Sequence, residues 1–321
     1  MQINEQLLRV KQKTVQLYRT YERWIIALSK LIGMCLILTW INQTVGSIAL
    51  LTKFYVVIGI GVLAMMLPSR YMIFLMMAIV TAHLVKLNLI MGGICALICL
   101  ATYIFVIRLY PKESILIIVM MLAYHFKVEL AVPMIIALCG TLSGLIPIVS
   151  GIVLVNIGTL GVSALKSGTL TNDPVQVIEY VLTTLSKNII GNSMFFTSVI
   201  VAIVVYFTVY IIKKQAMDYA PYIAICVGGV MNLLGFLCAI IFLEVEVNVG
   251  AVLGVTLFGV VVCVLIQYFS WPADYGRAEV VQFEDESNYY YVKVVPKILP
   301  ASTKGPVEQV YTDTQNEIEA Q

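Results

Sequence analysis

Few side chains of this sequence could carry out acid–base chemistry, and they fall into two groups beside apolar segments. The first group is His125, Lys127 and Glu129, between two short apolar segments. If a helix continues through this region, His125 and Glu129 lie one turn apart and can form a pH-sensitive hydrogen-bonded pair. The second group is His83 and Lys86, three residues apart near the end of another segment. The alternative for both groups is an interfacial turn whose charges are solvated.

The sequence lacks the patterns of common enzyme, metal and cofactor sites. It contains no G-x-S-x-G, H-E-x-x-H, P-loop or G-x-G-x-x-G motif. Only two histidines occur, and Glu129 is the only acid near the middle of an apolar region. All seven cysteines fall in apolar segments, where they are expected to fill space rather than bind zinc. We therefore expect no cofactor and no metal, and an enzyme is the less favoured interpretation.

The first group adjoins an uncharged run from residue 130 to residue 165. A single helix of this length would extend roughly 54 Å, whereas the hydrocarbon core of a bilayer is about 30 Å thick. The run must therefore fold back, and its glycines and prolines place the bend near Gly144 and Pro147. Whether residues 114–144 cross the membrane twice or form a re-entrant hairpin is left open, since both give the same topology.

The composition requires a lipid environment. Hydrophobic residues make up 60% of the chain and charged residues 12%, against about 25% charged in soluble domains. The sequence predicts an all-α polytopic membrane protein with about ten apolar segments, some of them short or re-entrant, within residues 24–269. The formal net charge of +2 predicts no nucleic-acid partner. A homo-oligomer is left open.

The distribution of basic residues predicts the orientation. Lysine and arginine concentrate on one side if the number of segments is even, and the positive-inside rule then places both termini in the cytoplasm. Residues 1–23 are expected to form a basic amphipathic helix, which either lies on the cytoplasmic membrane surface or extends the first span into solvent. Residues 173–190 are expected to form an amphipathic helix on the outer face, as a lid or a connector. Close helix packing is expected at four glycines: Gly140, Gly144, Gly250 and Gly254.

The C-terminal part changes character after the last apolar segment. Residues 278–283 and 289–295 have strand-like composition around a polar turn, so residues 270–298 are predicted to form a small cytoplasmic β-hairpin. An isolated hairpin is marginally stable in water, so residues 273–298 are expected to pair with a cytoplasmic partner, another copy or the inner loops. Residues 299–321 are polar and acidic and are expected to be disordered.

Two strings carry a resemblance to known sequences. These are SWPADYGRAEVVQFEDESNYYYVKVVPKI at 270–298 and YPKES at 110–114. They resemble the corresponding parts of uncharacterised polytopic membrane proteins of Gram-positive bacteria. The resemblance implies a bacterial plasma membrane and carries no activity.

Three functions are consistent with these features. The first is a non-enzymatic membrane subunit or scaffold of a cell-envelope assembly, which docks a partner through the hairpin. The second is a permease whose path is lined by the broken helices 114–165, where freed backbone groups can bind solutes. The third is a lipid-handling enzyme that uses His125 and Glu129.

Overall fold

The structure is a computed structural model that describes residues 2–166, 175–176, 178–179, 183, 191–215, 217–270, 279–284, 287 and 289–294. The chain divides into two compact units. The larger unit is Leu17–Gln267, and the smaller unit combines Met1–Gln16 with Tyr268–Gln321. Each unit is described by itself.

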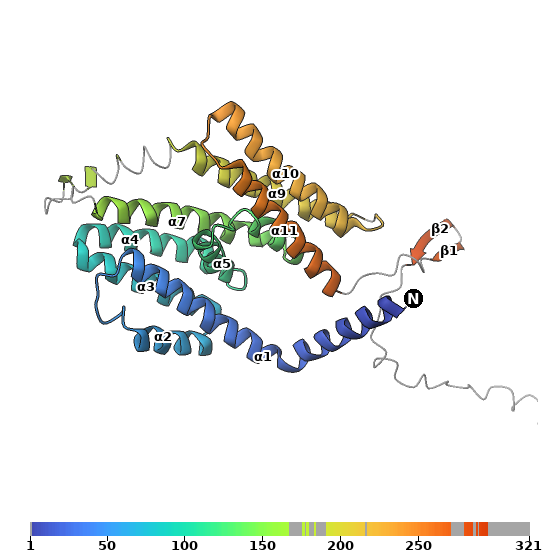
Figure 1. Ribbon diagram of the computed structural model, residues 1–321, viewed down its shortest axis with the longest axis horizontal. Coiled ribbons are helices and arrows are strands. Elements are labelled where there is room, and N and C mark those ends of the chain that lie inside the picture. The colour runs from blue at the N-terminus through green and yellow to red at the C-terminus, as the bar shows by residue number, and fades with distance from the viewer. Residues whose placement is uncertain are drawn as a thin grey trace, which may run out of the picture. The chain divides into compact units, whose positions relative to one another are not determined.

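Ten α-helices have both ends among the described residues (Figure 1). They are α1 (Gln2–Thr44), α2 (Phe54–Met66), α3 (Ser69–Leu87), α4 (Leu89–Thr102), α5 (Ile115–His125), α6 (Val132–Cys139), α7 (Leu145–Lys166), α9 (Ser193–Lys213), α10 (Ala220–Leu243) and α11 (Val249–Phe269). A π-helical turn (Tyr103–Ile107) extends α4, and a 3₁₀ turn (Leu142–Gly144) precedes α7. The helix expected before residue 24 is continuous with the first apolar segment in α1.

Seven helical segments of the described chain are long and apolar enough to cross a membrane. They lie at Gln16–Thr44, Ser69–Leu87, Leu89–Ile107, Leu142–Thr159, Ser193–Lys213, Ala220–Leu243 and Val249–Phe269. The prediction of about ten membrane segments is therefore not confirmed, because α2, α5 and α6 are shorter helices. α2 is short because the chain leaves α1 through Gly46, at a φ of 40°, and residues 45–53 are not helical.

The bend in the long uncharged run lies close to its predicted position. Pro133 stands in the first turn of α6, where its missing N–H is tolerated. α6 ends at Cys139, Gly140 is extended, and the helix resumes at Leu145. Pro147 lies in the first turn of α7 and does not itself break the helix.

Contacts in the first half of the larger unit show that its helices alternate in direction. The near side is defined here as the side where the spanning part of α1 begins, and the far side as the side where α1 ends. α2 runs back along α1 toward the near side, because Lys30 Nζ, in the middle of the spanning part of α1, donates to Leu67 O at 3.0 Å. α3 returns to the far side, where Ser47 Oγ donates to His83 O at 2.6 Å. α4 turns back at Asn88, whose side chain caps its first turn.

The helices that follow continue the alternation. The His125 ring at the end of α5 lies 5.5 Å from the Trp40 ring, on the far side. Glu113 precedes α5 and accepts a hydrogen bond from the hydroxyl of Ser143, which precedes α7. α5 and α7 therefore both start on the near side. Lys213 at the end of α9 contacts the end of α6, so both helices end there.

α10 then runs back along α9. Val209 and Val201 of α9 lie against Gly228 and Gly235 of α10, in reverse order. α11 reverses once more, because Gly229 and Asn232 of α10 lie beside Val260 and Thr256 of α11, in reverse order. The larger unit therefore begins and ends on its near side.

Two clusters of buried apolar side chains hold the larger unit together. One joins α1, α2 and α3 to α5, and the other joins α5 and α6 to α9, α10 and α11. On α5, Ile117 belongs to the first cluster and Met120 to the second; on α7, Val155 and Ile152 divide in the same way. In Figure 1, α5 and α7 accordingly lie between α1–α4 and α9–α11.

The smaller unit contains the predicted hairpin. β1 (Glu279–Glu284) and β2 (Tyr289–Val294) pair antiparallel, with Glu284 opposite Tyr289. This confirms a two-stranded hairpin near the C-terminus. The expected tail 299–321 lies outside the described residues. So does most of the expected helix 173–190, of which residues 175–176, 178–179 and 183 are helical.

Candidate functional site

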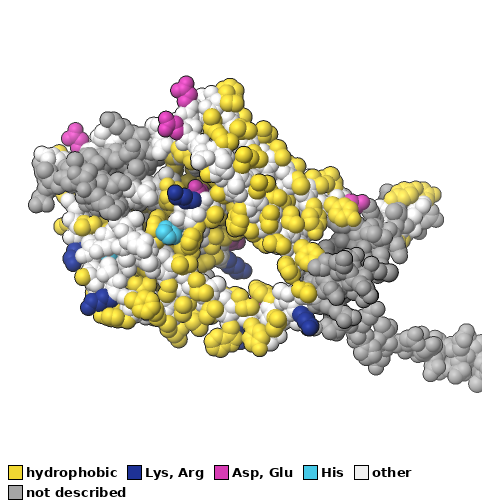
Figure 2. Space-filling view, viewed as in Figure 1, with side chains coloured by type: hydrophobic (Ala, Val, Ile, Leu, Met, Phe, Trp, Pro, Cys, Tyr) yellow, Lys and Arg dark blue, Asp and Glu magenta, His cyan; other side chains and the backbone are white. Residues whose placement is uncertain are grey.

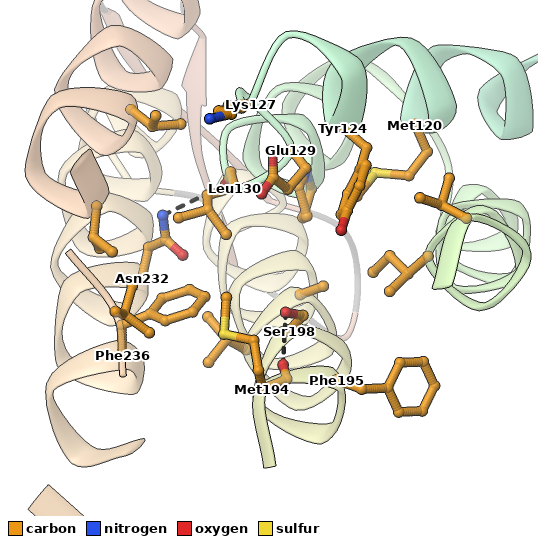
Figure 3. A pocket seen from close by; sticks show the side chains of 18 of the residues that line it. Met120, Tyr124, Lys127, Glu129, Leu130, Met194, Phe195, Ser198, Asn232 and Phe236 are labelled. Carbon is orange, nitrogen blue, oxygen red and sulfur yellow. Dashed lines mark hydrogen bonds between the residues drawn. The ribbon is translucent and has the colours of Figure 1, made fainter. Parts of the chain in front are cut away.

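A cavity of about 340 Å³ lies among α5, α6, α7, α9, α10 and α11, toward the far side. Figure 3 shows polar groups from different elements facing its interior. They are Tyr124 of α5, Glu129 of the α5–α6 turn, Ser198 of α9 and Asn232 of α10, and Asn156 of α7 also lines the cavity. The remaining wall is mostly aliphatic, aromatic and methionine side chains.

A tight reversal of the chain places Glu129 in this cavity. α5 ends at His125, and Lys127 adopts a left-handed backbone with a φ of 58°. The Val128 N–H then donates back to Ala123 O at 2.8 Å. The reversal turns the backbone toward α6 and directs the next carboxylate inward (Figure 3).

The Glu129 carboxyl group is only partly satisfied. Its Oε2 atom is buried and accepts no hydrogen bond from the part of the chain that the structure describes. Glu129 lies outside the seven spanning segments, and burial raises the pKa of its carboxyl group, while the charge of Lys127 acts in the opposite direction. A buried carboxylate oxygen without a partner is costly. This atom is therefore a candidate ligand-binding group.

Asn232 joins the turn to the last two helices. Its side chain is buried, and its Nδ2 donates to Thr256 Oγ1 of α11 at 2.9 Å and to Leu130 O at 3.4 Å. The carbonyl of Leu130 follows Glu129 in the turn. The amide thus holds the position of the turn against α10 and α11.

The structure separates the residues that the sequence grouped together. Lys127 and Glu129 line the cavity, but His125 does not; its ring packs beside Trp40 and Phe126. α5 ends at His125, so the helix that would pair His125 with Glu129 does not continue, and no hydrogen bond joins these two described side chains. Figure 2 shows basic, acidic and histidine side chains close together on this face.

His83 belongs to a different contact. It is fully buried, and its Nδ1 lies 3.3 Å from both Ile48 N and Ser47 Oγ. Its Nε2 atom is buried and has no partner among the described residues. His83 thus holds the connection after α1 against α3 by hydrogen bonds. Lys86 is exposed and takes no part in these bonds.

A second polar cluster closes the bend between α6 and α7 on the near side. Lys213 Nζ donates to Ala137 O at 2.5 Å, to Leu138 O at 3.1 Å and to Gly140 O at 2.7 Å. No N–H group of α6 donates to these carbonyls, because the helix ends there. Tyr206 hydroxyl donates to Thr141 O at 2.5 Å. Both side chains come from α9 and satisfy the broken backbone.

The glycines expected at helix contacts divide into two sets. A Cβ on Gly144 would lie 2.8 Å from the Tyr206 hydroxyl, so this glycine permits close packing at the bend. A Cβ on Gly140 would first meet the carbonyl of its own helix, at Ile136. Gly250 and Gly254 face no neighbouring helix of the described chain; α11 instead approaches α6 through Gly259, next to Ala131.

Sequence reasoning did not select Asn156, Ser198 or Asn232 as site residues. A polar side chain inside an apolar segment is the only signal they carry, and many such residues bond their own helix. The described residues contain no group of three His, Cys, Asp or Glu side chains that could hold a metal ion. Comparisons with protein-family models, with curated protein sequences and with solved structures find no match to this chain.

Proposed function

We propose that this chain is a multi-pass membrane protein that binds a solute in the cavity at Glu129, in the manner of a permease. The observation that carries the proposal is the buried, unbonded Glu129 Oε2 at the turn of a broken helix pair. Non-helical backbone at membrane depth is tolerated where protein or a water-filled cavity surrounds it. Transporters place solute sites at such breaks.

Two features of the larger unit support this proposal. α5 and α6 extend only about 16 Å and 12 Å, so their turn lies beside the cavity between much longer helices. On the near side the bend after α6 is closed by Lys213 and Tyr206. A cavity toward one side and a closed polar cluster on the other are expected of one conformation of an alternating-access protein.

The alternation of helices and the distribution of basic residues support one orientation of the larger unit. The near side carries most of them, and the positive-inside rule then assigns this side to the cytoplasm. The near-side bases in the described loops and helix ends are Arg19, Arg23, Arg70, Arg108, Lys112, Lys213 and Lys214. With the resemblance to Gram-positive membrane proteins, we propose a bacterial plasma membrane with both termini cytoplasmic.

Cysteine accessibility tests whether the cavity is hydrated. In a variant without the seven native cysteines, Ser198→Cys should react with a membrane-impermeant thiosulfonate added to the far side of intact cells. Ile200→Cys is the matched control, because Ile200 is an exposed apolar residue two positions along α9 that should face lipid. We expect at least tenfold faster modification at position 198. Equal protection of both cysteines would contradict a water-filled solute site.

The second candidate function is a membrane scaffold that docks a partner through residues 273–298. The observation in its favour is the exposure of Tyr289 and Tyr291, at 68% and 72%, on one face of β2. Exposed aromatic side chains on a strand are typical of interaction surfaces. This hairpin is small, and its pairing partner would supply the third strand that such sheets need for stability.

A double variant tests the scaffold function. Tyr289→Ser with Tyr291→Ser removes the aromatic face and leaves the paired backbone in place. Crosslinking followed by affinity purification should then lose specific partners that the unaltered protein retains. Tyr110→Ser, in a near-side loop, serves as the control. An identical partner set in all three proteins would remove the reason for assigning docking to the hairpin.

The enzyme hypothesis receives less support from the structure. It relied on His125 and Glu129 acting together, and these two side chains are not brought into contact. Glu129 is the one acid among the described residues that line the cavity. A binding role fits this arrangement better than general acid–base catalysis, which requires both groups within reach of one substrate.

A further inference from the structure

The polar groups around the cavity already use most of their hydrogen-bond donors within the protein. Asn232 Nδ2 donates to Leu130 O and Thr256 Oγ1. Asn156 Nδ2 donates to Ile152 O at 2.8 Å, and Ser198 Oγ donates to Met194 O at 2.8 Å. Because a carbonyl oxygen needs a donor, these bonds fix the orientation of each side chain.

The atoms that remain for a ligand are mainly acceptors. They are the two amide oxygens, the lone pairs of the Ser198 hydroxyl and the carboxylate of Glu129. Among these, Glu129 Oε2 is buried and unbonded. The remaining donors are the Tyr124 hydroxyl, one N–H of Asn156 and the ammonium group of the exposed Lys127. Apart from Lys127, acceptors are in excess, and this selects a ligand that brings its own donors.

The charges around the cavity also favour a ligand that brings hydrogen-bond donors. Among the described residues that line the cavity, Glu129 is the only acidic side chain and Lys127 the only basic one. Lys127 is exposed, and its ammonium group forms no ion pair with Glu129 within 4.0 Å. In Figure 3 the Lys127 side chain lies at the edge of the site, while the carboxylate faces the interior. The enclosed charge is therefore negative.

The size and wall of the cavity favour an organic ligand. Its volume of about 340 Å³ lies within the usual range for small-molecule sites, about 300–1,000 Å³. A bare metal ion would leave most of this space empty. Apolar side chains such as Met120, Met194 and Phe236 line the rest of the cavity and would surround an apolar body (Figure 3).

We infer that the solute is an organic cation, a protonated amine with an apolar body, whose ammonium group binds Glu129 and the amide oxygens. This inference rests on the proposed solute-binding function and names the class of its ligand. The ammonium group would donate to Glu129 Oε2 and neutralise the enclosed charge. Charge-assisted hydrogen bonds of this type are about twice as strong as neutral ones.

Three probes of matched size and different charge test the inference. Phenethylamine, 2-phenylethanol and phenylacetate are measured by equilibrium binding to the full-length protein in lipid nanodiscs at pH 7. We expect phenethylamine to bind at least about tenfold more tightly than the alcohol, and phenylacetate to show no saturable binding. Glu129→Gln should weaken phenethylamine binding by about 30-fold or more, because a buried charge loses its partner. Glu244→Gln is the control: Glu244 is an exposed acid at the end of α10 and does not line the cavity.

The outcomes separate the inference from the function on which it rests. Equal binding of the alcohol and the amine, unaffected by Glu129→Gln but lost in Asn232→Leu, would overturn the cationic ligand and keep the solute site. Saturable binding of phenylacetate in place of the amine would have the same meaning. Binding of none of the three probes to a folded protein would overturn both. Selective amine binding that depends on Glu129 and not on Glu244 would support the inference.

Discussion

Replacing Lys213 with Met should lower the melting temperature of the purified protein by about 5 °C, equivalent to about 3 kcal/mol for a chain of this length. The ammonium group donates to three carbonyls at the end of α6. Hydrogen bonds to charged groups contribute about 1.5–3 kcal/mol each, and the side chain is partly exposed, so we expect less than the sum of three. Thermal unfolding in detergent, followed by intrinsic fluorescence, measures the effect.

The neighbouring residue provides the control. Lys214 carries the same charge and is exposed, and its ammonium group lies 4.5 Å from the centre of the Tyr210 ring. Lys214→Met should therefore change the melting temperature by roughly 1 °C or less, since an exposed cation–π contact contributes about 0.5–1 kcal/mol. An equal decrease in melting temperature for both variants would show that the positive charge at the end of α9 stabilises the protein, rather than the hydrogen bonds to α6.

Replacing Gly92 with Ala should destabilise the protein, whereas the same change at Gly93 should not. A Cβ on Gly92 would lie 2.6 Å from both the N and Cα atoms of Val85, which are backbone atoms that cannot rotate away. α3 and α4 would have to separate, at a cost of about 1–3 kcal/mol. A Cβ on Gly93 would meet nothing within 4 Å, and alanine favours a helix by about 1 kcal/mol over glycine.

The two alanine variants should thus shift the melting temperature in opposite directions. The pair is informative because both residues lie in the same turn of α4 and differ only in the side of the helix that they occupy. The expected decrease for Gly92→Ala is about 2–5 °C. A decrease for Gly93→Ala of the same size would contradict the close contact between α3 and α4 and would indicate a general intolerance of the turn.

The Lys213 contact also bears on the proposed function. If α6 moves when the near side opens, the bonds from Lys213 and Tyr206 to residues 137–141 must break. The two side chains belong to one helix, so a displacement of α9 would release both together. In the proposed permease, the near-side cluster would keep that side closed while the cavity is accessible from the other.

The amino-acid sequence alone determined the class of the protein and several local features. A chain with so few charges needs lipid as its solvent, and uncharged runs longer than the bilayer must bend where glycine and proline interrupt them. The hairpin followed from strand-favouring residues on both sides of a polar turn. Glu129 could be selected because an acid beside apolar segments is rare. The hairpin and Glu129 were both predictable because each depends only on residues that are close together in the sequence.

Tertiary structure decided which of these residues form a site. The spanning helices are apolar around most of their circumference, so their sequences do not show which face packs inward. Ser198 and Asn232 join Glu129 only because α9 and α10 approach the α5–α6 turn, and His125 is excluded because α5 ends there and its ring turns toward α1. In the sequence Lys213 likewise resembles an ordinary interfacial lysine. Only the tertiary structure shows that it lies beside the end of α6. Long-range packing of small residues sets these distances, and a pattern of one segment contains no information about its neighbours.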